Sequence, residues 1–230
     1  MSFKSNMNVN TKNISFQARS PRIREAEKIC RYVTSEFSSI SASKMRSFDS
    51  VAKESRFPKA ISRIQNNIEN LIRIPAIEHK DVFKFYQYIV DAVKKHKVAN
   101  CGELSSLACL IGWVNNFKPI EAHLYAVSKK YGRRNSIDHS NILLPLDGEV
   151  IKGEDLYSNM KKVLVIDPWL GFVDFAPNAE LRYKNEFSKF LYIPEEAKLL
   201  GSKLYNPFSR MSEAELNYLK KQFKDLVFKQ

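Results

Sequence analysis

The pattern of this chain changes at residues 100–114, which read NCGELSSLACLIGWV. The apolar residues from Leu104 to Val114 recur at helical spacing, so we expect a helix that opens at Glu103 and ends before Lys118. The residues before this stretch have mainly helical patterns, and strand-like runs follow it. Helices first and strands later predict an α+β fold with an antiparallel sheet.

The expected elements can be placed along the chain. Before residue 100, apolar faces at helical spacing predict three helices, from Pro21, after Pro58 and over 81–95. After it, alternating or apolar runs predict four strands, at 122–128, 140–144, 163–166 and 172–175. The tail returns to helix, because Ser212 and Glu215 form a capping-box pattern before an apolar face. The polar segment 147–162 is expected to be a hairpin extension or a small helix.

Composition narrows the class of protein. With 230 residues, 44% of them hydrophobic, the chain can fold around a packed core. No apolar run approaches the roughly 20 residues that span a bilayer, and the N-terminus lacks the apolar stretch of a signal peptide. The three cysteines, Cys30, Cys101 and Cys109, imply no disulfide framework and fit a reducing compartment.

The net charge of +12 is spread along the whole chain. Basic charge raises the affinity for nucleic acids, anionic membranes and acidic proteins. Because zinc-finger spacing and long basic runs are lacking, we expect no nucleic-acid partner. We also expect no membrane span, and a monomer that acts on a protein substrate, for which an acidic protein is one candidate. Four basic residues flank a predicted hairpin turn and form either a solvated turn or a rim for an acidic substrate: Lys129, Lys130, Arg133 and Arg134.

Cys101 stands at the start of the predicted helix, two residues before Glu103. A free thiol is mostly protonated at neutral pH, and the positive end of a helix favours the thiolate form. Unpaired N–H groups at the same helix end can hold the oxyanion of a tetrahedral intermediate. Gly102 would let a substrate backbone approach, and Asn100 would offer a side-chain N–H to the oxyanion. These residues predict a nucleophilic cysteine with Asn100 and Gly102 at the oxyanion site.

A thiol nucleophile needs an imidazole that takes and returns a proton near neutral pH. Of the four histidines, His79 and His96 precede the cysteine and are expected on the surface. His123 lies in an alternating strand pattern, whereas His139 stands at the mouth of the next predicted strand, after a loop at 132–137. We favour His139, because strand mouths are where sheets present catalytic groups, and keep His123 as the alternative.

The third group of such a site orients the imidazole and stabilises its charged form. Asp167 follows the apolar residues 163–166 and precedes a proline that stops the strand. A carboxylate at the end of a buried strand is costly unless it has a partner, although strand-end aspartates are common. Asp174 is the alternative orienting residue, and Trp169 is either a wall of the site or part of the core.

The same residues admit other interpretations. Cys101, His139 and Asp167 would be a poor metal site, because no CxxC or HxxxH pair accompanies them, and we expect neither metal nor cofactor. Cys109 lies in the middle of the helix among apolar residues and would be poorly activated, and Cys30 lies on an apolar stripe that predicts a core position. In a structural protein, Cys101 would be an ordinary small residue.

Three motifs together resemble papain-like and transglutaminase-like cysteine hydrolases: Asn-Cys-Gly-Glu at 100–103, Asp-His at 138–139 and Val-Ile-Asp-Pro-Trp at 165–169. They are most similar to bacterial effectors and toxins of that clan, including glutamine deamidases, over residues 99–174. The resemblance implies a papain-like or transglutaminase-like fold with Cys101 as nucleophile, His139 as general base and acid, and Asp167 as the orienting group.

The chain also departs from that pattern. Papain-type proteases carry an oxyanion glutamine a few residues before the cysteine, and residues 96–100 hold none. The 28 positions from His139 to Asp167 exceed the usual gap of transglutaminase-like members. These departures make a plain housekeeping peptidase the less favoured member of the clan.

The resemblance therefore implies a cysteine hydrolase that acts on protein amides. It would be a glutamine deamidase, a cysteine protease or, where an amine replaces water, a transglutaminase. It would stay in the bacterial cytoplasm before a non-Sec system secretes it into a host cell as a virulence effector. The alternative function is a non-catalytic basic module that binds an acidic protein partner.

The chain is expected to have three parts. Residues 1–20 form a flexible leader, either an export signal or an ordinary disordered terminus, since the first acidic residue is Glu25. Residues 21–98 form a helical part, and residues 99–230 form the catalytic α+β core with a C-terminal helix. We expect residues 21–230 to fold as one compact unit.

Overall fold

The structure is a computed structural model, which describes residues 20–37, 79–96, 99–130, 133–147, 149–151, 157–191 and 198–228. Most of the predicted leader, the predicted helix after Pro58 and residues 152–156 of the polar segment lie outside the described residues.

A five-stranded antiparallel sheet forms the centre of the fold, in the order β4-β3-β2-β1-β5. The strands are β1 (Ile120–Lys130), β2 (Arg133–Pro145), β3 (Val163–Asp167), β4 (Phe172–Phe175) and β5 (Lys198–Tyr205). β1 and β2 pair along their length as far as Lys130 and Arg133. β2 pairs with β3 only over 142–145, so much of β2 extends past the end of β3.

Five α-helices surround this sheet in the described part of the chain. They are α1 (Pro21–Glu36), α4 (His79–His96), α5 (Cys101–Val114), α6 (Ala176–Leu191) and α7 (Glu213–Gln222). Three short 3-10 helices add to them: η1 (Tyr157–Asn159), η2 (Pro207–Arg210) and η3 (Lys224–Leu226). None of the described helices combines the length and apolar character that a membrane span needs.

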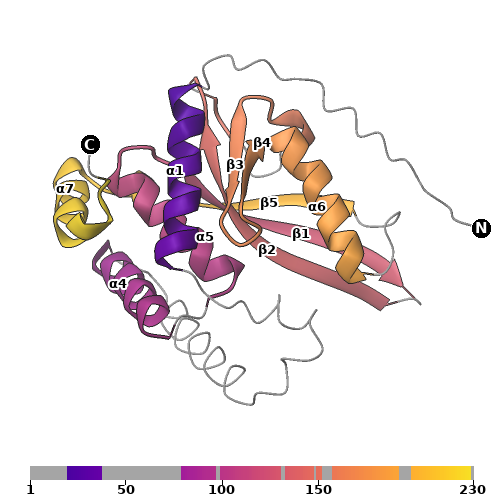
Figure 1. Cartoon of the computed structure of the whole chain (residues 1–230), viewed down its shortest axis with the longest axis horizontal. Coiled ribbons are helices and arrows are strands. Elements are labelled where there is room, and N and C mark those ends of the chain that lie inside the picture. Colours follow the sequence, from indigo (N-terminus) through magenta and orange to yellow (C-terminus); the bar gives the residue numbers. More distant parts are fainter. Residues whose placement is uncertain are drawn as a thin grey trace, which may run out of the picture.

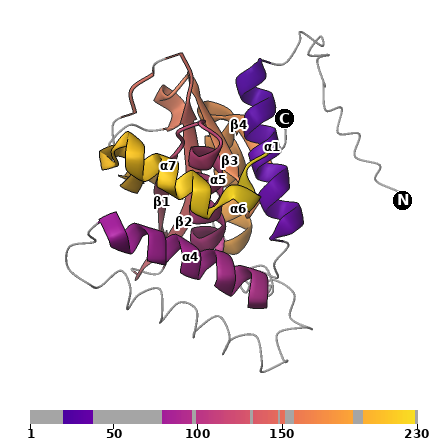
Figure 2. The same cartoon turned by 90° about the vertical axis from the view of Figure 1, so that its left-hand side faces the viewer.

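The helix α5 is the central element of the helical layer. Every residue from Glu103 to Val114 is buried, as expected of a helix that is apolar on all sides. It contacts α1, α4 and α7 as well as β1 and β2. Figure 2 shows α4 and α7 in front of α5, with α1 beside them. Several elements therefore hold α5 in place.

The sheet separates two apolar cores, because alternate strand residues point to opposite faces. Ile142 and Ile166 belong to the core that contains α1, α4, α5 and α7. Leu143 and Val165 belong to the second core, which contains Tyr183 of α6. In Figure 1, α6 lies along the sheet on the right, apart from α4 and α7 on the left.

The predicted α+β class with an antiparallel sheet is confirmed. The helices expected from Pro21 and over 81–95 correspond to α1 and α4, and the four expected strands correspond to β1–β4. The capping box before α7 is also present, since the Ser212 N–H donates to Glu215 Oε2 at 2.7 Å. The polar segment contains a short 3-10 helix, η1.

The patterns did not predict α6 and β5. β5 reads KLLGSKLY and pairs with β1 at the edge of the sheet. Lysine and glycine are depleted in strands, and edge strands tolerate them better than central ones. The sequence of α6 begins APNAEL, directly after β4, so no loop residues separate the two elements.

Candidate active site

Cys101 is the first residue of α5, and Asn100 is its N-cap. The helix thus opens two residues earlier than predicted. Asn100 has an extended backbone, and its N–H donates to Glu103 Oε2 at 2.8 Å, which stabilises this earlier start. The half-buried Cys101 thiol therefore lies in the first helical turn, where backbone N–H groups have no acceptor within the helix.

His139 lies inside β2, and the prediction that it stands at a strand mouth was wrong. β2 begins at Arg133, so most of the predicted loop 132–137 is strand, paired in regular register with β1. The long pairing with β1 outweighs the polar composition of that segment. His139 still borders the end of a strand, because the neighbouring β3 stops at Asp167.

The structure brings His139 and Asp167 together. The last β2–β3 pair is Ile142 with Ile166, and the same register continued would place Asp167 across from Asn141. His139 is two residues from Asn141 and therefore shares its face of the sheet. The His139 Nε2 atom lies 2.6 Å from Asp167 Oδ2, and these two residues are 2% and 0% exposed.

Charge and hydrogen bonds set the protonation of this pair. Burial lowers the pKa of His139, but the Asp167 carboxylate and a hydrogen bond with the Cys101 thiol outweigh burial and raise it to about 10. At neutral pH the ring is therefore an imidazolium. Because Asp167 engages Nε2, the ring nitrogen that remains for the thiol is Nδ1. The imidazole therefore lies between the other two groups, with the Cys101 thiol on one ring nitrogen and the Asp167 carboxylate on the other.

The Asp167 carboxylate is satisfied at both oxygens. Oδ1 accepts the Leu170 N–H at 2.8 Å, and Oδ2 accepts the Tyr183 hydroxyl at 2.9 Å in addition to His139. The turn after Asp167 closes with the Gly171 N–H on the Asp167 carbonyl at 2.8 Å. Gly171 has φ 75°, a value that favours glycine, so this tight turn suits the residue. Three donors thus compensate for the burial of the carboxylate.

Aromatic rings enclose the imidazole. The ring centroids of Trp169 and Tyr183 lie 5.3 Å and 5.4 Å from that of His139. Trp169 therefore contributes both to the wall of the site and to the core, where it is buried. Open space borders Gly102 instead, because a Cβ added there would meet no atom within 4 Å. A reactant would approach from the start of α5.

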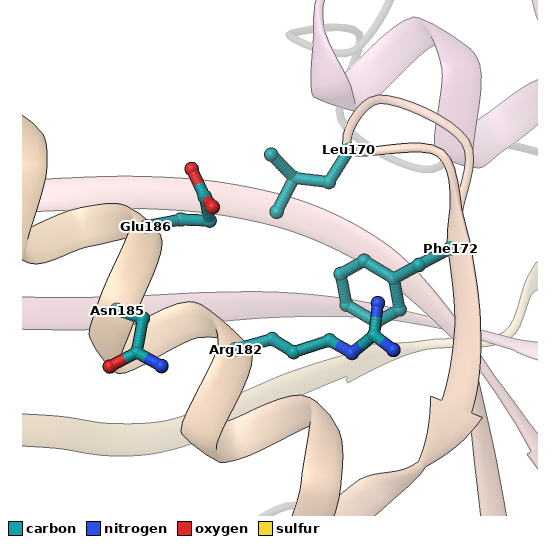
Figure 3. A pocket seen from close by; sticks show the side chains of 5 residues that line it. All are labelled: Leu170, Phe172, Arg182, Asn185 and Glu186. Atoms are coloured by element: carbon teal, nitrogen blue, oxygen red, sulfur yellow. The ribbon is translucent and has the colours of Figure 1, made fainter. Parts of the chain in front are cut away.

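A surface pocket of about 370 Å³ lies beside this site, between the β3–β4 hairpin and α6. In Figure 3, Leu170 and Phe172 extend from the hairpin toward α6, and Arg182 extends from α6 toward Phe172. Asn185 and Glu186 of α6 complete the lining. The Phe172 ring packs against Tyr183 at 5.5 Å, and the Leu170 backbone holds Asp167. The pocket and the His139–Asp167 pair therefore share the same hairpin.

The alternative candidates have other partners. His123 contacts Ser140 Oγ through Nδ1 at 2.9 Å and Glu121 through Nε2 at 3.6 Å. Asp174 pairs with Arg182 at 3.0 Å. The structure therefore brings neither His123 nor Asp174 to the His139–Asp167 pair.

The other two thiols are buried and poorly suited to attack. Burial raises the pKa of Cys30 to about 12, and burial also raises the pKa of Cys109. Cys30 nonetheless touches the site from α1, with its Sγ 3.8 Å from the Asp167 carbonyl and 3.7 Å from the Phe172 carbonyl. Sequence patterns gave no signal for this contact, nor for that of Tyr183.

Among the residues that the structure describes, no three His, Cys, Asp or Glu side chains gather as a metal site. The Asn100 backbone N–H is bonded to Glu103 Oε2, whereas the N–H groups of the first turn of α5 have no acceptor within the helix and are therefore the better oxyanion donors. Several predicted surface residues have side chains outside the described part: His79, His96, Lys129, Lys130, Arg133 and Arg134.

Comparison with models of protein families, with curated proteins and with solved structures found no match to this chain. The geometry of the site is therefore the basis for a functional assignment.

Proposed function

We propose that this protein is a cysteine hydrolase that acts on protein amides through Cys101, His139 and Asp167. One observation carries the proposal: a buried imidazolium–carboxylate pair contacts a thiol in the first turn of a buried helix. Burying two charges is costly, and perturbed titratable groups of this kind concentrate at functional sites.

The chemistry follows from the order of the groups. His139 carries the proton as an imidazolium, and the Cys101 sulfur attacks the carbonyl carbon of the amide as a thiolate beside it. The N–H groups of the first turn of α5 stabilise the oxyanion that forms. His139 then gives its proton to the departing nitrogen, the carbon–nitrogen bond breaks and a thioester on Cys101 remains. Water, deprotonated by the now neutral His139, attacks the thioester, and the acid product leaves as the carbon–sulfur bond breaks and Cys101 returns to a thiolate beside the His139 imidazolium.

The arrangement also supports a papain-like or transglutaminase-like assignment. The nucleophile begins a buried helix, and the histidine and aspartate follow on adjacent antiparallel strands, in the chain order Cys, His, Asp. Within that clan, deamidation of a glutamine side chain is the first candidate reaction and peptide hydrolysis is the second. The pocket beside the hairpin offers a place for a neighbouring side chain of the protein substrate.

An activated ester tests the proposed chemistry without a known substrate. p-Nitrophenyl acetate should give a burst of nitrophenol and leave an acetyl group on Cys101, which peptide mapping locates. Cys101→Ser and His139→Ala should lose both signals, and Cys109→Ala, which removes another thiol of the same helix, should keep them. Acetylation spread equally over the three cysteines, or none at all, would refute the proposal.

A protein substrate then separates the two reactions. With casein, ammonia release without new peptide termini identifies a deamidase, and new termini without ammonia identify a peptidase. Cys101→Ser is the control for both measurements, because it keeps the size of the side chain and removes the thiol.

A further inference from the structure

The hydroxyl of Tyr183 in α6 donates a hydrogen bond to Asp167 Oδ2, the carboxylate oxygen that also bonds His139. The distances to Asp167 Oδ2 are 2.9 Å from the tyrosine oxygen and 2.6 Å from His139 Nε2. Tyr183 is 0% exposed, so water does not compete for its hydroxyl. A buried hydroxyl needs a partner, and this one is bonded to the least exposed charged group of the candidate site.

We propose that Tyr183 is a positioning residue that holds the Asp167 carboxylate in its orientation, and so holds His139 toward Cys101. The proposal rests on the proposed function and adds a residue from α6, a helix that the sequence patterns did not predict. Tyr183 would act through Asp167 and His139, without touching the reacting atoms.

The Asp167 carboxylate receives one donor from each of three elements. The Leu170 N–H of the β3–β4 turn fixes Oδ1, while His139 of β2 and Tyr183 of α6 share Oδ2. The hydroxyl adds a hydrogen bond that holds the carboxylate when the imidazole gives up its proton during the reaction. Hydrogen bonds to a charged group are stronger than those between neutral groups.

The position of Tyr183 on α6 is itself fixed. Glu180, one turn earlier, accepts the Ser158 N–H at 2.7 Å and Lys184 Nζ at 2.6 Å, which ties α6 to η1. The Tyr183 ring also packs at 62° against the His139 ring and at 5.5 Å from Phe172. Replacing the hydroxyl alone would therefore leave the ring in place.

The titratable groups that face Asp167 come from four elements. They are His139 on β2, Tyr183 on α6, Tyr157 on η1 and Cys30 on α1. Only His139 carries a positive charge among them, and the pKa values of Tyr157, Tyr183 and Cys30 are all raised, chiefly by burial. These three groups are uncharged at neutral pH, so they can stabilise the Asp167 carboxylate only by donating hydrogen bonds to it.

Tyr157 provides a matched control. It is also buried, its ring centroid lies 6.1 Å from that of Tyr183, and its hydroxyl donates to Asn141 Oδ1 at 2.9 Å. Tyr157→Phe thus removes the same group from the same core without breaking a bond to Asp167. Tyr183 also shares a hydrogen bond with Asn141. Because Tyr157→Phe removes a bond to Asn141 too, an effect that Tyr183→Phe alone shows would belong to the bond to Asp167.

The test is the rate of Cys101 alkylation by iodoacetamide as a function of pH, followed by peptide mapping. Without the hydroxyl, the Asp167 carboxylate has one donor fewer and orients the His139 ring less firmly, so Tyr183→Phe should lower the rate of Cys101 alkylation across the profile. At mildly acidic pH, Cys101 should react about tenfold more slowly than in the wild type. Tyr157→Phe should keep the wild-type profile, even if thermal unfolding shows that both variants are less stable.

A second comparison separates positioning from a loss of stability. In an Asp167→Asn background the hydroxyl has no charge to support, so Tyr183→Phe should cause little further slowing, and the two effects should not add. Additive effects, equal slowing in both tyrosine variants or an unchanged Tyr183→Phe profile would overturn the role of Tyr183. Wild-type protein in which Cys101 reacts no faster than Cys30 would instead overturn the proposed function, and the role of Tyr183 with it.

Discussion

The buried His139–Asp167 pair should make the stability of the protein fall as the pH rises above neutrality. The pKa of His139 is raised from 6.5 to about 10, because Asp167 and Cys101 outweigh the effect of burial. Between these pH values the folded protein keeps a proton that the unfolded chain releases. The stabilisation is therefore complete below about pH 6.5 and is lost as the pH rises toward 10.

The expected magnitude follows from that interval. Each pH unit inside it costs about 1.4 kcal/mol, so the pair contributes a loss of about 3 kcal/mol between about pH 7 and pH 9. Total stabilities of domains are about 5–15 kcal/mol, which makes this loss measurable by urea unfolding. In His139→Gln this contribution is absent, so the difference in unfolding free energy between wild type and variant should shrink by about 3 kcal/mol over the same range.

Other groups titrate in the same pH range, but their contributions cancel when the unfolding free energies of the wild type and the variant are subtracted. His123→Gln is the matched control, because His123 bonds Ser140 and Glu121 and does not contact Asp167. It should keep the wild-type slope of unfolding free energy against pH. Parallel curves for the wild type and His139→Gln would refute the inference that His139 is charged when folded.

Three further predictions concern single residues. Asp167→Asn should slow the acetylation of Cys101 by p-nitrophenyl acetate by at least about a hundredfold, because the imidazole loses its orienting charge, and a change of less than about threefold would contradict this role. Gly102→Ala should keep or slightly raise the melting temperature, since the added Cβ meets no atom within 4 Å, but it should slow casein turnover; unchanged turnover would mean that substrate does not approach there. Burial raises the pKa of Glu121 to about 8, so ionisation of the unfolded chain lowers stability by about 1.4 kcal/mol per pH unit between about pH 4.5 and 8. Glu121→Gln should remove that slope in urea unfolding, and an unchanged slope would contradict the raised pKa.

Much of the fold could be predicted because it follows from local patterns. The apolar faces of α1, α4 and α5 and the alternating or apolar runs of β1–β4 can be seen in the sequence itself. The predicted start of α5 was two residues too late. The hydrogen bond between the Asn100 N–H and Glu103 sets the start of this helix, and the apolar pattern does not show it. α6 and β5 have weak patterns and depend on packing against distant strands.

The candidate site divides in the same way. Cys101 and Asp167 could be singled out because one begins a helix and the other ends a buried strand. His139 was chosen for a strand-mouth position that it does not have, since it lies inside β2. Tyr183 and Cys30 could not be singled out, since a tyrosine or cysteine on a helix is normally a core residue. Their contacts with Asp167 depend on how α6 and α1 cover the β3–β4 hairpin, and that is a property of the tertiary structure.

The most direct test of the central claim compares the three cysteines under brief, dilute iodoacetamide at mildly acidic pH, with peptide mapping of the products. Cys101 should be alkylated selectively, because it lies half-buried beside the His139 imidazolium while Cys30 and Cys109 are buried and their pKa values are raised. His139→Ala should abolish the selectivity. Slow and equal labelling of Cys30, Cys101 and Cys109 in the wild type would contradict the claim that Cys101 is a nucleophile.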